Sequence, residues 1–455
     1  MKRYKLYSIL ICYLLIFQSC EKFLDKKNDD RLVVPKTLED LQAILNDVTI
    51  MNTNTPAFME ETADDFFVTD ATFDSDPYSQ PLHVWEPFIY NHAGAIDWSM
   101  SYLSIYNSNL VLELIENIDR NSNNEVMWNN IKGSALFYRA FRNLNLCWSF
   151  SKAYDEGTAQ QDLGIVIRLG SDFNVPSVRA SVKESYQHII SDLDAASQYL
   201  ANNPINPYRP SKAAVYGLFA RTYLSMRNYE LAYKYANLAL ELKNDLVNFN
   251  NSSDVGTGNN PFKPYPYNKE VVFYSEMSNS TTFKAPSNGL IDTVLYSSYA
   301  TNDKRKTVFF RANGKYQRFK GTYASSNLLL FSGIATDELY LIRAEAHARS
   351  GRVTEAMADL NLLLQNRYLT GQLNPLSATT KEQALAFILT ERRKELLMRG
   401  LRWMDLKRLN KEGANITLKR VLKGKTYTLP PNDNRYAIPL PNDIIQLTGM
   451  PQNPR

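Results

Sequence analysis

Residues 211–242 read SKAAVYGLFARTYLSMRNYELAYKYANLALEL, and this stretch decides the expected fold. Alanine and tyrosine recur in it at helical spacing, on both sides of a short turn at Arg227-Asn228. Residues three and four positions apart share one face of a helix, and alanine leaves room for a close neighbour. We therefore expect two tightly packed helices, whose interface is formed by Tyr216, Ala220, Tyr223, Ala232, Ala236 and Ala239.

This spacing matches the tetratricopeptide pattern, in which a small residue, an aromatic residue and a later alanine recur on a helix pair. Residues 337–366 repeat it, with Ser350-Gly351 at the turn. His347 stands where Tyr223 stood in the first copy. We expect His347 to pack between helices and not to bind a ligand.

Further helices are expected at 96–118, 127–150, 181–200 and about 380–409. Trp98 has the spacing of helix core, and Ser181 with Glu184 forms a capping box at the start of its helix. This makes roughly eight scaffold helices, or four pairs. Short strands are expected at Val271–Ser275, Val308–Ala312 and Tyr436–Pro439. The expected class is mainly α, or α-dominant α+β, with long loop-rich insertions.

The first twenty residues predict the compartment. Met1–Lys5 carries three positive charges, and Leu6–Phe17 is an apolar run of twelve residues. A helix of that length covers about 18 Å, which is too short to span a bilayer. Residues 1–19 are therefore typical of a secretory signal peptide. Cys20 follows Ser19 as in a bacterial lipobox, so we expect Cys20 to carry a diacylglycerol anchor; the alternative is ordinary secretion.

Charge and cysteine content exclude other classes of protein. The formal net charge is +4, of which three charges lie in the signal peptide, so the mature chain is nearly neutral. A nucleic-acid binder usually has a basic domain, so we expect no nucleic-acid partner. After processing, Cys147 is the one remaining internal cysteine, and we expect it to be buried in a helix.

Aromatic residues are concentrated in polar loops. Eleven of them lie between Phe58 and Tyr106, and six lie between Phe262 and Phe283. Aromatic rings among Asp, Asn and Ser suit the apolar faces and hydroxyls of carbohydrate; alternatively, the rings anchor long loops onto the helices. The candidate ligand-binding residues are Tyr78, Trp85 and Phe88 after the Asp76-Pro77 turn, and Tyr265, Tyr267 and Asn268 in a proline-stiffened loop.

Catalytic motifs are mostly absent from the sequence. The four histidines form no metal-binding motif, and no phosphate loop or nucleophile elbow occurs, so we expect no metal, no cofactor and no enzyme activity. The pairs Glu60-Glu61 and Asp64-Asp65 leave a glycosidase as a weaker alternative. The charged stretch 390–409, TERRKELLMRGLRWMDLKRL, could bind an anion. An ion-paired amphipathic helix with Leu396, Trp403 and Leu406 turned inward is favoured.

The ordered pieces CEKFLDKK, PKTLEDLQAILND, EETADDFFVTD, KGSALFYRAFRNLNLCWSF and YAIPLPNDIIQLTGMPQNPR together resemble the SusD/RagB family of surface lipoproteins. The resemblance covers nearly the whole chain. It implies a scaffold of four tetratricopeptide-like helix pairs. It also implies a non-catalytic binder of glycan or another nutrient, anchored in the outer membrane over a SusC-like TonB-dependent transporter. Cys20 is the one site residue that the resemblance transfers.

The expected organisation is a signal peptide at 1–19 and a single domain at 20–455, with halves at 20–250 and 251–455. A surface-exposed, lipid-anchored glycan binder is the favoured function. The open alternatives are the same role with a peptide ligand, a lipid-anchored glycoside hydrolase, and a tetratricopeptide adaptor that binds protein only.

Overall fold

The computed structural model describes residues 35–90 and 96–455. The predicted signal peptide and Cys20 lie outside the described residues. Contacts within the chain unite Leu38–Arg455 in one compact unit. Helices dominate this unit and the strands are short, which confirms the predicted fold class.

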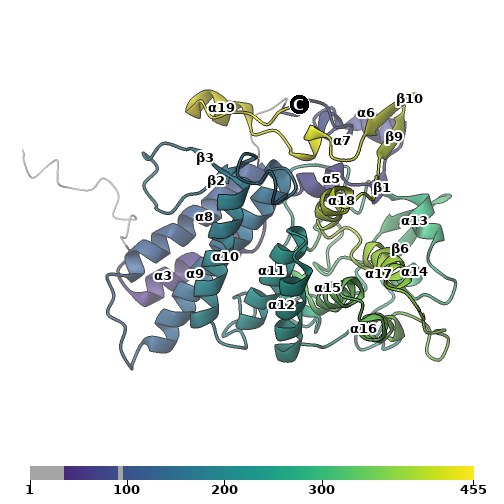
Figure 1. Cartoon of the computed structure of the whole chain (residues 1–455), viewed down its shortest axis with the longest axis horizontal. Coiled ribbons are helices and arrows are strands. Elements are labelled where there is room, and N and C mark those ends of the chain that lie inside the picture. The colour runs from purple at the N-terminus through teal and green to yellow at the C-terminus, as the bar shows by residue number, and fades with distance from the viewer. Residues whose placement is uncertain (1–34, 91–95) are drawn as a thin grey trace, which may run out of the picture. The chain divides into compact units, whose positions relative to one another are not determined.

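The scaffold is a series of long helices, each packed against the next (Figure 1). Helix α9 lies between α8 and α10; α11 and α12 form the pair predicted from 211–242; and α12 packs on α15. The helices of this scaffold are α3 (Leu38–Leu45), α8 (Ile96–Ile115), α9 (Glu125–Phe150), α10 (Val182–Tyr199), α11 (Lys212–Ser225), α12 (Tyr229–Leu242), α15 (Thr336–Arg349), α16 (Val353–Gln365) and α17 (Lys381–Glu395).

Side-chain caps start several of these helices where the sequence predicts. Ser181 and Glu184 form the predicted capping box at the start of α10. Ser211 caps α11 and Asn228 caps α12. Each cap satisfies a backbone N–H that has no partner inside the helix.

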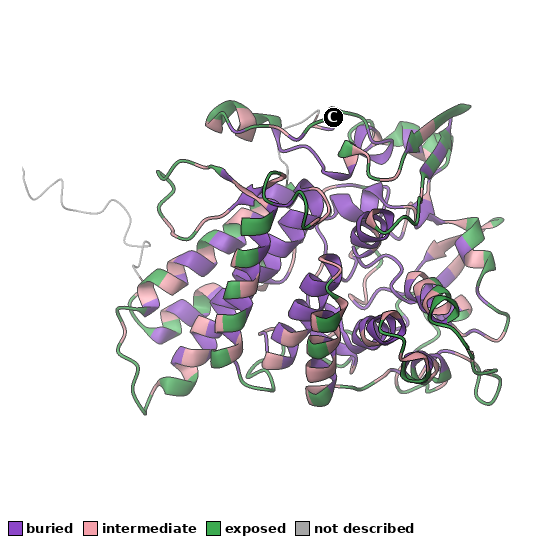
Figure 2. Cartoon of the chain, in the orientation of Figure 1, coloured by how far each residue is buried: buried purple, intermediate pink, exposed green. Residues whose placement is uncertain are grey.

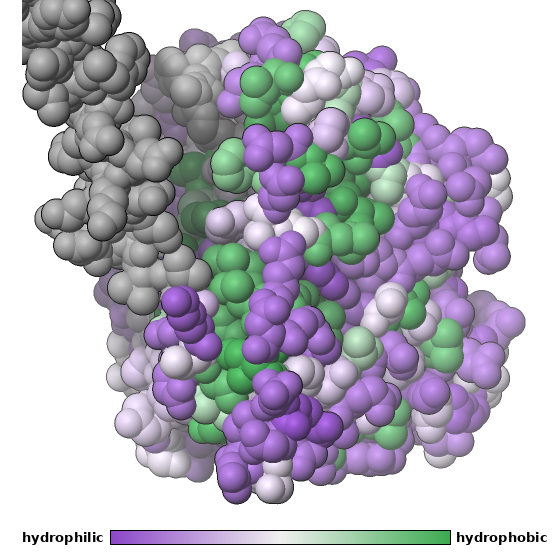
Figure 3. All heavy atoms as spheres, turned by 90° about the vertical axis from the view of Figure 1, so that its left-hand side faces the viewer, coloured by the Kyte–Doolittle hydropathy of each residue, from purple (hydrophilic) through white to green (hydrophobic). Residues whose placement is uncertain are grey.

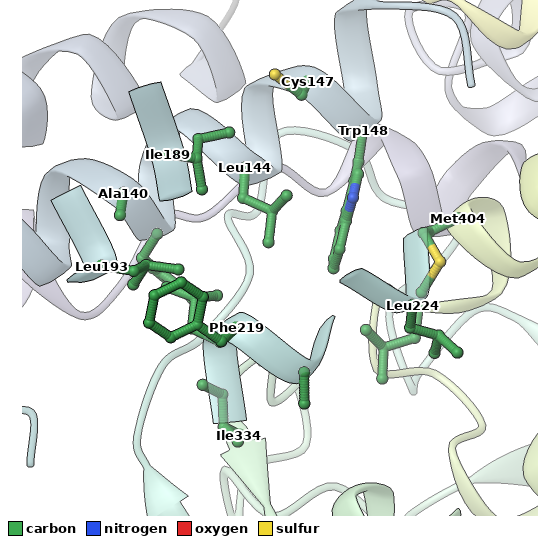
Figure 4. Packing of buried hydrophobic residues seen from close by; sticks show 14 of the residues in the cluster. Ala140, Leu144, Cys147, Trp148, Ile189, Leu193, Phe219, Leu224, Ile334 and Met404 are labelled. Carbon is green, nitrogen blue, oxygen red and sulfur yellow. The ribbon is translucent and has the colours of Figure 1, made fainter. Parts of the chain in front are cut away.

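The main core lies between the helices, where α9 is buried on nearly all sides (Figure 2). Ala140, Leu144 and Trp148 of α9 face side chains from α10 and α11 (Figure 4). Cys147 is buried in this core, as predicted. Trp98 and His347 are also buried, in agreement with their predicted packing roles.

Within the described residues, five antiparallel two-stranded sheets link the loops between helices. Their pairs are β1 (Phe66–Phe67) with β5 (Leu290–Ile291), β2 (Leu163–Val166) with β3 (Arg179–Ser181), β4 (Val271–Phe273) with β8 (Ile334–Ala335), β6 (Phe310–Asn313) with β7 (Tyr316–Phe319), and β9 (Leu418–Leu422) with β10 (Lys425–Leu429). A second cluster of buried apolar residues, rich in phenylalanine, lies beneath β1, β4, β6 and β7.

Short helices complete the loops. They are α4 (Val48–Met51), α5 (Phe58–Thr62), α6 (Asp70–Ser75), α7 (Gln80–His83), α13 (Thr293–Ser297), α14 (Arg305–Val308), α18 (Arg402–Lys411), α19 (Asn442–Thr448) and the 3₁₀ turn η1 (Asn434–Tyr436). No helix among the described residues is long and apolar enough to cross a membrane.

Three predicted elements differ in the structure. The helix expected at 380–409 is two helices, α17 and α18, because Met398 and Gly400 adopt positive φ and turn the chain between them. The strand expected at Tyr436–Pro439 does not form; Tyr436 ends the 3₁₀ turn instead. Strand β6 begins at Phe310, because the preceding residues Arg305–Val308 form α14.

The charged stretch 390–409 is ion-paired as predicted, but most of its charges are buried. Arg408 donates to Glu345 on α15 and to Asp405. Arg392 donates to Asp405 as well, with an Nε–Oδ2 distance of 2.8 Å. These pairs join α15, α17 and α18. Lys407 is the exception in this stretch: it is buried and donates to the carbonyls of Trp148 and Ser151, without a carboxylate partner among the described residues.

Candidate ligand-binding site

The predicted ligand residues have different environments. Tyr78, Phe88 and Tyr267 are exposed, at 57%, 77% and 73% of their surface. Tyr265 is half-buried and stacks on Tyr274, with ring centroids 4.7 Å apart. Asn268 is buried, and its side-chain oxygen accepts a hydrogen bond from the Glu270 backbone.

Trp85 lacks the exposed ring face that its predicted role requires, because it is only 4% exposed. Its Nε1 donates to the Thr62 carbonyl over 3.0 Å, and the Arg420 guanidinium lies 4.7 Å from the ring centroid. The turn at Asp76-Pro77 exposes Tyr78, but the chain then leads Trp85 back into the protein. Of the six predicted residues, Trp85 alone lines a described cavity.

That cavity is a cleft of about 350 Å³ between β1 and the β9–β10 hairpin. One wall comes from the aspartate-rich segment that carries β1, and the opposite wall is the edge of β9. The residues that line the cleft are Asp64, Phe66, Phe67, Val68, His83, Trp85, Asp292, Arg393, Thr417, Leu418, Lys419, Arg420, Val421 and Leu422.

Ion pairs fix the carboxylates of the cleft. Asp64 accepts from Arg402 at 2.7 and 3.0 Å and pairs with Arg393 at 3.2 Å. Burial opposes its ionisation, but the charges of Arg402 and Arg393 outweigh burial and lower the pKa of Asp64 to about 2. Asp292 also pairs with Arg393, at 3.3 Å. Lys419 is exposed, and no ion pair of the described chain uses its ammonium group.

Of the half-buried aromatic rings in this region, Phe67 lines the cleft. Phe67 in β1 meets Tyr316 in β7 edge to face, with centroids 5.2 Å apart. Tyr296 in α13 follows Asp292 by four residues and packs edge to face on Phe310, at 5.2 Å. Phe67, Tyr296 and Tyr316 are each partly exposed. The arrangement offers ring surfaces for apolar contact beside groups that form hydrogen bonds, the combination expected of a small-molecule site.

Behind the cleft, buried carboxylates hold the fold together. Glu61 hydrogen-bonds His83 Nδ1 over 2.7 Å and accepts from the Lys284 backbone. Glu60 accepts from the Gly400 backbone over 2.7 Å. Burial and the neighbouring Asp65 raise the pKa of Glu60 to about 8, whereas burial and Arg420 lower the pKa of His83 to about 4. Glu60 and Glu61 are thus enclosed by the protein and do not face the cleft as a glycosidase pair would.

A second cavity, of about 280 Å³, lies between α8, the β2–β3 connection and α19. Tyr102 and Asn109 direct their hydrogen bonds to backbone carbonyls, and Arg168 does the same. Exposed apolar residues such as Phe173 and Leu447 surround it, and apolar groups are visible between polar ones on this face (Figure 3). A sugar would find few free hydrogen-bonding groups there, so the β1–β9 cleft is the better candidate.

Comparison with known proteins identifies the family. Residues 22–224 match a SusD-like family described as starch-binding and associating with the outer membrane, and residues 221–454 match the SusD family. The second match alone covers just over half of the chain. The chain belongs to the SusD family. The resemblance predicted from the sequence is thereby confirmed.

Solved structures show the SusD-like fold. A candidate sugar-binding protein from Bacteroides vulgatus aligns with a TM-score of 0.75 and 20% identity, over 93% of this chain and 99% of that one. A SusD superfamily protein from Bacteroides thetaiotaomicron aligns with a TM-score of 0.74 and 20% identity, over 92% of this chain and 100% of that one. A curated relative, SusD-like protein P38 of Formosa agariphila, is 36% identical over 91 residues, which are 19% of this chain and 18% of that protein.

In this SusD-family chain, sequence reasoning missed Phe67, Tyr296 and Tyr316. Phe67 lies in the aromatic-rich stretch that was recognised, but its neighbours come from distant parts of the sequence. Asn313-Gly314 is a strong hairpin signal and would have placed Tyr316 on a strand. Within 35–90 and 96–455, no group of three His, Cys, Asp or Glu side chains is arranged to hold a metal ion.

Proposed function

We propose that the protein is a non-catalytic, lipid-anchored nutrient-binding protein of the outer-membrane surface. It captures oligosaccharide and delivers it to a SusC-like TonB-dependent transporter. Membership of the SusD family supports this role, and so does a family description that names starch binding and the outer membrane. The lipid anchor is Cys20, and the protein has no nucleic-acid partner and no cofactor.

The observation that carries the proposal is the β1–β9 cleft, which Phe67 lines and where Tyr316 packs against the Phe67 ring. A pyranose ring has an apolar C–H face that packs on an aromatic ring. Its hydroxyls then need partners, which Lys419, Thr417 and the edge of β9 supply beside that ring. The cleft therefore combines both requirements of sugar binding.

The test is a binding screen of the soluble protein, begun after Cys20, against neutral and acidic polysaccharides and against peptides. We expect oligosaccharide binding by calorimetry, without release of reducing ends. Phe67→Ala should weaken that binding about tenfold, on the scale of the about 1–3 kcal/mol that one aromatic ring contributes when a nucleic-acid base stacks on it.

Tyr267→Ala is the matched control, since Tyr267 is equally aromatic, more exposed and outside the cleft. Equal losses of oligosaccharide affinity in both variants would indicate that the sugar binds outside the cleft. Binding of peptides alone would favour the peptide-capturing alternative. Glycan cleavage that tracks the purified protein would contradict the non-catalytic role.

A further inference from the structure

Two hairpins beside the cleft are strongly basic. Residues 304–320 contain seven Lys and Arg and no Asp or Glu, and residues 417–428 contain four Lys and Arg and no Asp or Glu. The first segment carries β6 and β7, and the second carries β9 and β10. The whole chain has 51 basic and 47 acidic residues, so this is a local excess and not a property of the protein.

Most of these cations have no carboxylate partner within the described chain. In 304–320, ion pairs involve Arg305 alone, which contacts Asp303, Glu391 and Glu395. Arg311 donates to the Pro286 carbonyl, and Lys320 Nζ donates to the Gly258 carbonyl. In the second hairpin, Lys423 pairs with Asp74. The remaining cations of the two segments without a carboxylate partner are Lys304, Lys306, Lys315, Arg318, Lys419, Arg420 and Lys425.

Some buried arginines of the chain pair with a carboxylate, whereas others, such as Arg142, donate to backbone carbonyls. Arg399 pairs with Asp337 at 2.7 Å, and Arg221 pairs with Glu338 at 2.5 Å. Arg420 is 6% exposed and, like Arg142, donates only to backbone carbonyls, including that of Glu61 over 3.0 Å, but unlike Arg142 it lines the cleft. Burial and the nearby charge of Arg311 also lower the pKa of Lys320. Positive charge around the cleft is thus only partly neutralised by the protein.

The unpaired lysines lie beside the aromatic rings. Lys315 Nζ is 5.1 Å from the centroid of Tyr316, whose ring contacts Phe67. Lys306 Nζ is 5.3 Å from the centroid of Tyr296. Lys419 lines the cleft itself. A sugar packed on these rings would place its substituents near ammonium groups.

We propose that the cleft selects an anionic glycan, one that carries carboxylate or sulfate groups on its sugars. This inference rests on the proposed function and specifies its substrate class. The rings of Phe67 and Tyr316 hold the sugar face, while Lys315 and Lys419 pair with its anionic groups. A concave site with aromatic rings favours a glycan over a membrane surface or a nucleic-acid duplex.

The experiment measures affinity of the soluble protein for two matched pairs of probes. One pair is oligogalacturonate and its methyl-esterified, neutral form; the other is dextran sulfate oligomers and dextran. We expect tighter binding of the anionic member of at least one pair, and loss of that preference as NaCl is raised. Whichever pair shows the preference distinguishes carboxylate from sulfate.

The double variant Lys315→Ala/Lys419→Ala should lose about tenfold in affinity for the anionic probe and keep its thermal midpoint, since both side chains lack ion pairs. Lys183→Ala, an exposed lysine on α10, is the control and should bind like wild type.

Equal affinity for charged and neutral members, or an unchanged double variant, would overturn the inference while the glycan-binding role stands. Binding of anionic vesicles or DNA with no binding to any glycan would overturn both proposals.

Discussion

Trp85 lies at the base of the cleft, where its ring meets the Arg420 guanidinium and its Nε1 donates to the Thr62 carbonyl. Trp85→Ala should therefore lower the free energy of unfolding by about 3–5 kcal/mol, the usual cost of removing a buried tryptophan. Urea denaturation checks this. Phe88→Ala in the same loop should leave stability unchanged, because Phe88 is 77% exposed. An unchanged midpoint for Trp85→Ala would argue that the ring serves binding alone.

The buried carboxyl of Glu60 makes the stability of the folded protein depend on pH. Its carboxyl keeps a proton in the folded protein up to about pH 8, whereas the unfolded chain releases it near the ordinary value of 4.5. Between these values the folded state binds more protons, so Glu60 makes stability fall as pH rises.

Glu60→Gln removes this ionisable group. The difference in Tm between the variant and wild type should therefore shift in favour of the variant from about pH 5 to about pH 8, and then level off. Calorimetric scans across that range measure it, with the exposed Glu382→Gln as control. A difference that does not change with pH would contradict the assignment of a protonated, buried Glu60.

At the scale of elements, the α11–α12 pair depends on small residues at its interface. Ala220 and Ala232 are fully buried. Ala220→Leu should overpack this interface and lower stability by about 1–3 kcal/mol. Ala201→Leu, at an exposed position after α10, is the control and should have little effect. Thermal unfolding of the two variants checks this prediction. Equal midpoints for Ala220→Leu and Ala201→Leu would contradict a close approach of α11 and α12.

Local signals in the sequence were sufficient to predict the scaffold. The capping box at Ser181, the alanine spacing of 211–242 and the turn at Ser350-Gly351 each act within a few residues, and α10, α11, α12, α15 and α16 form where they predict. The break between α17 and α18 could not be predicted by periodicity, because the apolar pattern continues across Met398, which adopts φ of 59°.

The candidate site was harder to predict, because it is formed by contacts between distant segments. Phe67 meets Tyr316 only because β1 pairs with β5, which packs beside β7. Trp85 is buried by Arg420, a residue more than 300 positions later in the chain. Residue spacing within one segment cannot reveal these contacts. The sequence therefore predicts that the loops are rich in aromatic residues, but not which of their rings are exposed.

At the scale of the whole molecule, we propose that Cys20 carries a lipid that anchors the helical unit to the outer membrane. Cys20→Ala should release the full-length protein from membranes, because the apolar run at residues 6–17 is too short to span them. Fractionation after a high-salt wash measures this. Cys12→Ala changes a cysteine inside the predicted signal peptide and should leave the protein anchored. Retention of the Cys20→Ala protein in the membrane fraction would contradict the lipid assignment.

A crystal structure of the soluble protein with the oligosaccharide found in the screen tests the proposed sugar site most directly. We expect a sugar ring against Phe67 and Tyr316, with its polar groups toward Lys419 and the edge of β9. A sugar held instead by Tyr78 and Phe88, by the Tyr265–Tyr267 loop, or in the apolar cavity beside α8 would contradict it.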